Sequence, residues 1–215
     1  MNKIFSLLLA LCISASVSAQ KALNAADAAE VEKSIEAQTS KLTTIKSNFK
    51  QTKHINGMSK DYVATGDMMY KKDNKVILNY TTPKKYKMVV NGEKVMMENN
   101  GKKNVYNTKG AGASMNEMQA MITACMTGNL QSLKNKYKLT YYEDGQNYLV
   151  KVVPITGKKI FKDIEMELKK SDKMLTRLRL TETAKAGKSG NDYTEYSFSG
   201  TEQNISLADS LFTIE

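Results

Sequence analysis

The chain has 215 residues, a formal net charge of +10 and one histidine. Its lysines are spread along the chain and accompany no nucleic-acid recognition motif, which argues against a nucleic-acid-binding protein. A single histidine, with no glycine-rich phosphate loop, nucleophile elbow or CxxC motif, leaves neither a His-based triad nor a metal cluster, so we expect no enzyme, no metal and no cofactor.

The first residues predict a secretion signal. Lys3 supplies the positive start, Ile4–Ile13 is an apolar run, and Val17–Ala19 places small residues before a cleavage point after Ala19. The expected organisation is a signal peptide over residues 1–19 and one domain over residues 20–215, exported to the periplasm. Removal of the signal would leave Cys125 as the one cysteine, so no intramolecular disulfide is expected.

The domain is predicted to begin with a helix and to continue in short strands. Residues 23–41 carry alanines and an apolar spacing at Val31 and Ile35 that favours an amphipathic helix. Strand patterns bounded by turn residues such as Asn56–Gly57, Asp73–Asn74 and Asn91–Gly92 follow, with connections too short for helical crossovers. The predicted strands before the middle of the chain are 44–51, 62–70, 76–80, 86–90, 94–98 and 102–106.

A second helix is predicted over residues 114–126, where apolar side chains recur at three- and four-residue spacing. Ser114 and Glu117 form a capping box, and Gly128 ends the helix. A short helix over 130–135 follows. The second set of predicted strands is 137–142, 148–153, 160–168, 175–183 and 193–198, with a last edge strand at 211–214.

About ten antiparallel strands with helices at the start and in the middle predict a mainly β (α+β) fold. The expected architecture is one large curved sheet with helices packed on its concave face, which would bury every apolar stripe.

Methionine is the most informative residue type, because the chain has 13 of them. Methionine is flexible and polarizable, so it suits a binding surface that tolerates varied apolar partners, although an ordinary methionine-rich core explains the same composition. Strand alternation and the apolar face of the predicted helix over residues 114–126 predict a ligand-binding cavity. Such a cavity would bind a hydrocarbon chain without a charged side chain to hold it. The residues expected to line it are Phe49, Met68, Tyr70, Leu78, Tyr80, Met88, Val90, Met97, Met118, Met121 and Ile122.

Several segments, in order, resemble the LolA family of periplasmic lipoprotein carriers. Phe49–Lys50–Gln51 resembles the family's Phe-x-Gln, and Gly66 with Met68 and Tyr70 resembles its second strand. Val76–Pro83 resembles its aromatic-Arg-Trp-x-Tyr-x-x-Pro segment, although Ile77 and Leu78 stand where the family has Arg and Trp. The remaining similar segments are Val89–Val95, Val105–Tyr106, and Asn204 with Asp209, Leu211 and Phe212.

This resemblance implies an incomplete, strongly curved antiparallel barrel with helices as a lid over a hydrophobic cavity. It also implies a monomeric carrier that takes lipoprotein acyl chains from an inner-membrane lipoprotein-releasing transporter to an outer-membrane acceptor. Two alternatives stay open. One is a carrier of another lipid, and the other is an envelope-stress sensor that uses the same cavity and binds a membrane regulator. A hydrolase is the third class considered, and the missing catalytic constellation argues against it.

Overall fold

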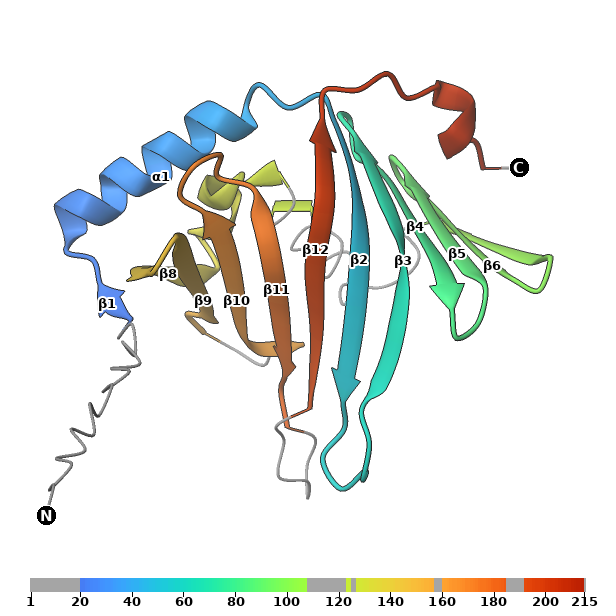
Figure 1. Cartoon of the computed structure of the whole chain (residues 1–215), viewed down its shortest axis with the longest axis horizontal. Helices are drawn as coiled ribbons and strands as arrows, with labels where there is room; N and C mark the ends of the chain where they lie inside the picture. The colour runs from blue at the N-terminus through green and yellow to red at the C-terminus, as the bar shows by residue number, and fades with distance from the viewer. Residues whose placement is uncertain (1–19, 108–122, 125–126, 157–159, 185–191, 215) are drawn as a thin grey trace, which may run out of the picture.

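The computed structural model describes residues 20–107, 123–124, 127–156, 160–184 and 192–214. Most of this part is one antiparallel sheet of twelve strands in the order β1-β8-β9-β10-β11-β12-β2-β3-β4-β5-β6-β7 (Figure 1). The strands are β1 (Lys21–Ala22), β2 (Thr44–His54), β3 (Tyr62–Lys71), β4 (Lys75–Thr82), β5 (Tyr86–Asn91), β6 (Lys94–Asn99), β7 (Lys102–Asn107), β8 (Tyr137–Asp144), β9 (Asn147–Pro154), β10 (Phe161–Lys169), β11 (Leu175–Glu182) and β12 (Tyr193–Gln203).

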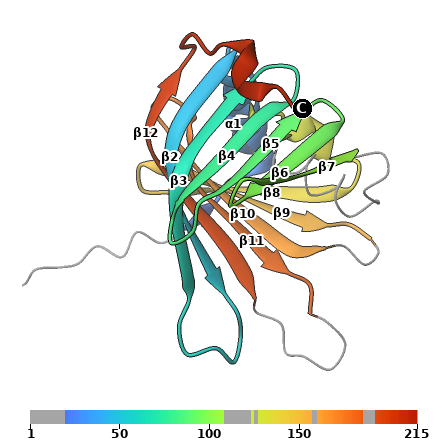
Figure 2. The ribbon, with the colours of Figure 1, turned by 90° about the vertical axis from the view of Figure 1, so that its right-hand side faces the viewer.

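The sheet curves strongly and does not close, because β1 and β7 lie at its two ends with no pairing between them (Figure 2). This confirms the expected curved, incomplete barrel. The two-residue strand β1 was not predicted, and it pairs with β8 through Lys21 and Ala22. The long-range pair of β2 with β12 joins the two halves of the sheet, with Phe49 opposite Phe198.

Local turn chemistry explains the hairpins. Asp73 and Asn74 both have positive φ, 69° and 58°, in the three-residue connection between Lys71 of β3 and Lys75 of β4, and Asp and Asn tolerate this conformation better than most residues. Between β2 and β3, the Met58 amide donates to the Ile55 carbonyl, and Gly57 takes the positive φ of 89° that the turn needs. The predicted turns at Asp73–Asn74 and Asn56–Gly57 therefore lie where the sequence placed them.

Helix α1 (Ala25–Thr39) packs on the inner face of the sheet through Val31 and Ile35, which are both buried. Its first turn is capped by Asn24, whose side-chain oxygen accepts from the Asp27 amide at 2.9 Å. A short 3-10 helix, η1 (Leu130–Leu133), also packs there through its two leucines. No helix among these residues is long and apolar enough to cross a membrane.

The carboxyl-terminal segment covers part of the outer face. The expected edge strand at 211–214 is wrong: Asp209–Phe212 forms a 3-10 helix, η2. Phe212 is fully buried against Ile77, Val89 and Met96, which form a small second core. Burial of this ring, together with the contacts of Asp209 with Lys71 and Lys75, positions the segment without any strand pairing.

Candidate functional site

The inner face of β2 to β6 carries continuous rows of apolar side chains. Register pairs Met68 with Leu78, Leu78 with Met88 and Met88 with Met97, so one row crosses four strands. The next row joins Tyr70, Val76, Val90 and Val95 in the same way. Laterally paired residues share a face of the sheet. The eight predicted lining residues of the sheet therefore lie on one face: Phe49, Met68, Tyr70, Leu78, Tyr80, Met88, Val90 and Met97.

These eight side chains differ in how far they are buried. Phe49, Met68, Tyr70, Leu78 and Val90 belong to the buried core. Tyr80, Met88 and Met97 are only partly buried and pack against that core. The inner face is thus tightly packed in part and retains accessible apolar surface on β4, β5 and β6.

An aromatic cluster lies toward the end of the sheet where β2 finishes. The Phe49 ring lies edge-on to Tyr80, with centroids 4.9 Å apart, and to Tyr196 at 6.0 Å. Tyr86 meets Tyr80 at 5.6 Å, and Phe198 stacks on Tyr196 at 6.3 Å. The cluster brings β12, β2, β4 and β5 together around a single patch of rings.

The tyrosines in this cluster stay neutral phenols. Burial is the main reason why the pKa of Tyr80 and that of Tyr196 lie above the ordinary tyrosine value. Burial also raises the pKa of Tyr86. The hydroxyl oxygens of Tyr80 and Tyr196 are 3.4 Å apart. The patch therefore offers apolar ring faces together with uncharged hydroxyl groups, a combination suited to an amphipathic molecule.

Sequence reasoning missed three members of this cluster. Tyr86, Tyr196 and Phe198 were not among the predicted lining residues. Tyr196 and Phe198 alternate with Glu195 and Ser197 in β12, so the alternation of apolar and polar residues was the available signal. Only the pairing of β12 with β2 shows that they meet Phe49.

The predicted second helix lies mostly outside the described residues, as do Met118, Met121, Ile122 and Cys125. Thr123, Ala124 and Thr127 are helical, and Gly128 follows with φ +65°. Ala124 is buried in the inner-face core. The Thr123 hydroxyl donates to the Asn74 side chain at 3.3 Å, so this turn sits beside the β3–β4 hairpin.

Gly128 marks a close approach between this turn and α1. A Cβ built on Gly128 would lie 2.5 Å from Thr39 Cγ2 and 2.9 Å from Ile35 Cγ2. Only glycine combines that space with the positive φ of the position. The end of the predicted second helix is therefore held against the carboxyl-terminal half of α1.

An ion pair connects α1 to η1 at the edge of the inner core. Glu32 is buried, and Lys134 Nζ lies 2.7 Å from its Oε2. Glu32 Oε1 and the Tyr141 hydroxyl are buried without completing a hydrogen bond of good geometry among the described residues. Burial, followed by the charge of Glu32, raises the pKa of Tyr141. The pair ties the helix to the segment that follows Gly128.

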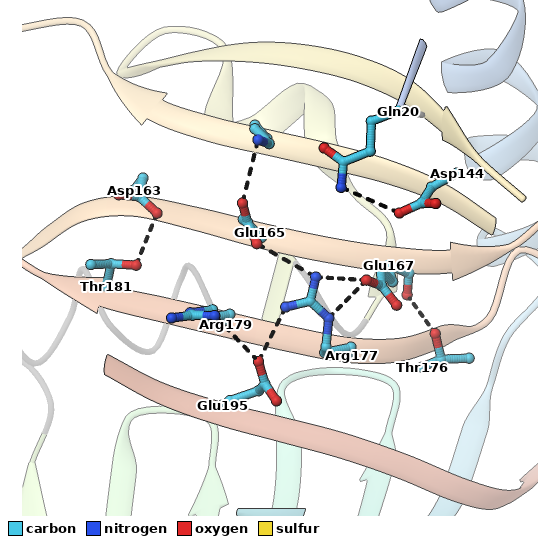
Figure 3. A network of polar contacts seen from close by, with 11 residues as sticks. Gln20, Asp144, Asp163, Glu165, Glu167, Thr176, Arg177, Arg179, Thr181 and Glu195 are labelled. Atoms are coloured by element: carbon cyan, nitrogen blue, oxygen red, sulfur yellow. Dashed lines mark hydrogen bonds and ion pairs between the residues drawn. The ribbon is translucent and has the colours of Figure 1, made fainter. Parts of the chain in front are cut away.

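The outer face of β9 to β12 has the opposite chemistry. Arg177 lies between three carboxylates: 2.6 Å from Glu167, 3.2 Å from Glu195 and 3.4 Å from Glu165 (Figure 3). Burial lowers the pKa of the Arg177 guanidinium, but Glu167 and Glu195 outweigh that effect and leave the pKa above its ordinary value. Glu165 and Glu167, which alternate with apolar residues in β10, thus face a shared arginine.

A hollow of about 460 Å³ adjoins this network on β2, β3, β4 and β12. Its lining is mixed, because Phe49 and Phe198 line it together with polar residues such as Asn48, Lys50 and Asp67. His54 pairs with Asp61 at 2.8 Å instead of joining a catalytic group. Among the described residues, no three His, Cys, Asp or Glu side chains gather into a metal-binding group.

Sequence and structure comparisons relate the chain to known proteins. No curated protein matches the chain. Among solved structures, MucB matches with a TM-score of 0.52 and 13% identity over 89% of this chain and 64% of MucB. A LolA superfamily protein from Nitrosomonas europaea matches at 0.44 and 9% identity, covering 85% of this chain and 97% of that protein.

Lipoprotein LppX of Mycobacterium tuberculosis matches with a TM-score of 0.45 and 11% identity, over 85% of this chain and 98% of LppX. A family model for the outer membrane lipoprotein carrier protein LolA matches residues 40–215, which is most of the sheet together with η1 and η2. The chain belongs to the LolA family.

Proposed function

We propose that the chain is a carrier of the cell envelope that shields a lipid hydrocarbon chain on the inner face of its sheet. The observation that carries this proposal is the accessible part of that face, made by Tyr80, Met88 and Met97 beside a fully packed core. Each buried methylene group contributes about 0.8 kcal/mol, so a long acyl chain would bind without a charged partner. Membership of the LolA family supports lipoprotein acyl chains as the cargo.

The predicted cavity lining is part of this proposal. The sheet residues Phe49, Met68, Tyr70, Leu78 and Val90 would form its floor, and Tyr80, Met88 and Met97 its accessible wall. Met118, Met121 and Ile122 would form the cover, and Gly128, which follows them in the chain, lies against α1. We also propose that residues 1–19 are removed after Ala19 on export to the periplasm, which sequencing of the mature amino terminus would test.

The central experiment measures binding of a fluorescent acyl probe and the mass of the natively purified protein. Met88→Asp and Met97→Asp should abolish probe binding, because covering an unpaired carboxylate with an acyl chain costs on the order of several kcal/mol. Val63→Asp is the matched control. Val63 pairs with Thr52 of β2, and alternation along the strand puts both residues on the outer face, opposite to Phe49. A folded Met88→Asp variant that binds like the wild type would contradict the proposed site.

The transfer route is a finer proposal. An inner-membrane lipoprotein-releasing transporter would load the chain, and an outer-membrane acceptor would unload it. Photo-crosslinking from the exported protein in cells tests this route. Recovery of neither kind of membrane protein, together with preserved acyl binding, would restrict the proposal to a carrier of another lipid.

A sensor of envelope stress is the second candidate. MucB, which shares the fold, has been solved in complex with MucA. A sensor would form a stable complex with a membrane regulator, and acyl binding would change the stability of that complex. A pull-down that recovers such a regulator and no transporter would favour this second function.

A further inference from the structure

The hairpin turns at one end of the sheet form a distinct surface. Because the strands are antiparallel, the turns after β2, β4, β6 and β9 all lie at the same end of the sheet, and the turn after β4 connects the strands of Tyr80 and Tyr86 in the aromatic cluster. We call this surface the open-end rim and define it as residues 55–63, 83–85, 100–102 and 153–156. The β2–β3 hairpin extends beyond the turn between β4 and β5 in both views (Figures 1 and 2).

Exposed apolar side chains concentrate on the open-end rim. Eight large hydrophobic side chains are exposed among the described residues, and five of them belong to the rim. Met58 is 60% exposed at the tip of the β2–β3 hairpin, and Ile155 is 56% exposed after β9. The other three are Tyr62, Val63 and Val153. Such clustering marks an interaction surface, whereas singly scattered apolar residues need no explanation.

The same surface carries uncompensated positive charge. Lys60, Lys84, Lys85 and Lys102 are exposed, and none of them lies within ion-pair distance of a carboxylate in the described part of the chain. Three nearby carboxylates have other partners: Asp61 contacts His54, Glu182 pairs with Lys53, and Asp192 accepts from the Asn56 backbone amide. The rim is therefore cationic, in keeping with the +10 charge of the chain.

The projecting hairpin is held in place by specific contacts. His54 pairs with Asp61 at 2.8 Å across the hairpin and stacks on Tyr193 at 5.1 Å. The Arg179 guanidinium lies 3.7 Å from the centre of the same Tyr193 ring. The Asn56 backbone amide donates to the Asp192 carboxylate at 2.8 Å. A tip supported in this way presents Met58 with little loss of conformational freedom on docking.

We propose that the open-end rim docks on an anionic lipid bilayer, with Met58, Tyr62 and Ile155 entering the interface and the four lysines contacting headgroups. Separate apolar tips interspersed with lysines match an interfacial surface better than a continuous protein groove. Docking would place the aromatic cluster next to the membrane, so a hydrocarbon chain would cross little water. This role of docking in the transfer of a hydrocarbon chain rests on the proposed carrier function, but docking itself requires no cargo.

The test is co-sedimentation of the full mature chain with vesicles of phosphatidylcholine alone and of an equal mixture with phosphatidylglycerol. The expected result is binding to the mixed vesicles, weakened by added salt because the headgroup attraction is screened. Lys60→Ala should lower the partition coefficient about fivefold, and Met58→Ser about tenfold. Lys94→Ala and Leu211→Ser, exposed at the opposite end, are the matched controls and should bind like the wild type.

Several outcomes would overturn the proposal: no binding to either vesicle, equal binding to both, or equal losses in rim and control variants. Acyl-probe uptake from solution, measured in parallel on the same folded variants, should be unchanged by Lys60→Ala and Met58→Ser. If the probe fails to bind while vesicle docking persists, the carrier function is wrong and the docking surface stands. If the probe binds and the vesicles do not, only the docking proposal is wrong.

Discussion

Phe49 meets Tyr80 edge-to-face, with ring centroids 4.9 Å apart and ring planes at 76°. The two residues lie on β2 and β4, which are separated by β3, so the contact crosses an intervening strand. Gly66 in β3 makes this contact feasible, because it pairs with both residues and has no side chain. A missing side chain in the middle strand thus lets the two rings touch.

Gly66→Ala should therefore disrupt the aromatic cluster. A Cβ at this position would lie 2.1 Å from the Asn79 carbonyl oxygen and 2.9 Å from Phe49 Cζ, so backbone or ring must move. We expect a loss of about 2–4 kcal/mol in the free energy of unfolding, measured with urea.

The matched control is Gly92→Ala. It has a positive φ but no atom within 4 Å of the added Cβ, and it should cost about 1 kcal/mol. If Gly66→Ala costs no more than Gly92→Ala, the close approach at Gly66 does not stabilise the protein as described.

Arg177 should matter more to stability than its neighbour Arg179. Arg177→Gln would leave Glu165, Glu167 and Glu195 near one another without their shared cation. We expect a loss of about 2 kcal/mol, less than for a fully buried pair because these side chains remain partly solvated. Arg179→Gln is the control, since among the described carboxylates Arg179 pairs with Glu195 alone, at 3.9 Å, and otherwise lies over the Tyr193 ring.

Added salt offers an independent check on this explanation. Screening weakens repulsion among the carboxylates, so the deficit of Arg177→Gln should shrink as the salt concentration rises in urea titrations. A deficit that does not change with salt would mean that lost packing of the arginine side chain, and not charge, is responsible.

Strand alternation predicted the inner face well, because each residue's face depends only on its position in the strand. It placed Met68, Leu78, Met88 and Met97 together, and the register of β3 to β6 agrees. Short hairpins made these pairings local, so the sequence contained the information needed.

Long-range pairing explains what could not be predicted. Tyr196 and Phe198 join the site through the pairing of β12 with β2, and no local pattern shows which distant strands meet. The same holds for η2. Leu211, Phe212 and Ile214 have the composition of a strand, but the anchoring of the segment on the outer face determines its conformation.

The attachment of this segment should depend on pH. Asp209 accepts hydrogen bonds from Lys75 and also pairs with Lys71, and these contacts hold the pKa of its carboxyl below the ordinary value of 3.8. A lowered folded-state pKa contributes stability above the unfolded pKa and loses it as pH falls through the folded value. The anchor should therefore be intact at neutral pH and weaken below about pH 4.

Hydrogen exchange of residues 207–214 measures this effect directly. Asp209→Asn should lower the protection of this segment against exchange at neutral pH. It should also abolish the further loss of protection that the wild type shows as the pH falls below about 4. Ser210→Ala, in the same 3-10 helix, is the control and should keep the wild-type profile. An unchanged profile in Asp209→Asn would show that the Asp209 carboxylate does not hold the segment.

Ile77 is apolar at a position where the resemblance to the LolA family predicts arginine. Substitutions of Ile77 test whether the carboxyl-terminal segment, which covers it on the outer face, explains this difference. Ile77 is 3% exposed and packs against Phe212, so Ile77→Arg would bury a cation without a partner or displace the carboxyl-terminal segment. We expect a loss of about 4 kcal/mol in unfolding free energy, and about 1 kcal/mol for Ile77→Val. Val105→Arg is the matched control, because Val105 lies in the same cross-strand row but is 46% exposed. Its substitution should change stability by no more than about 0.5 kcal/mol. Equal stability of Ile77→Arg and Val105→Arg would mean that η2 does not close over this row in solution.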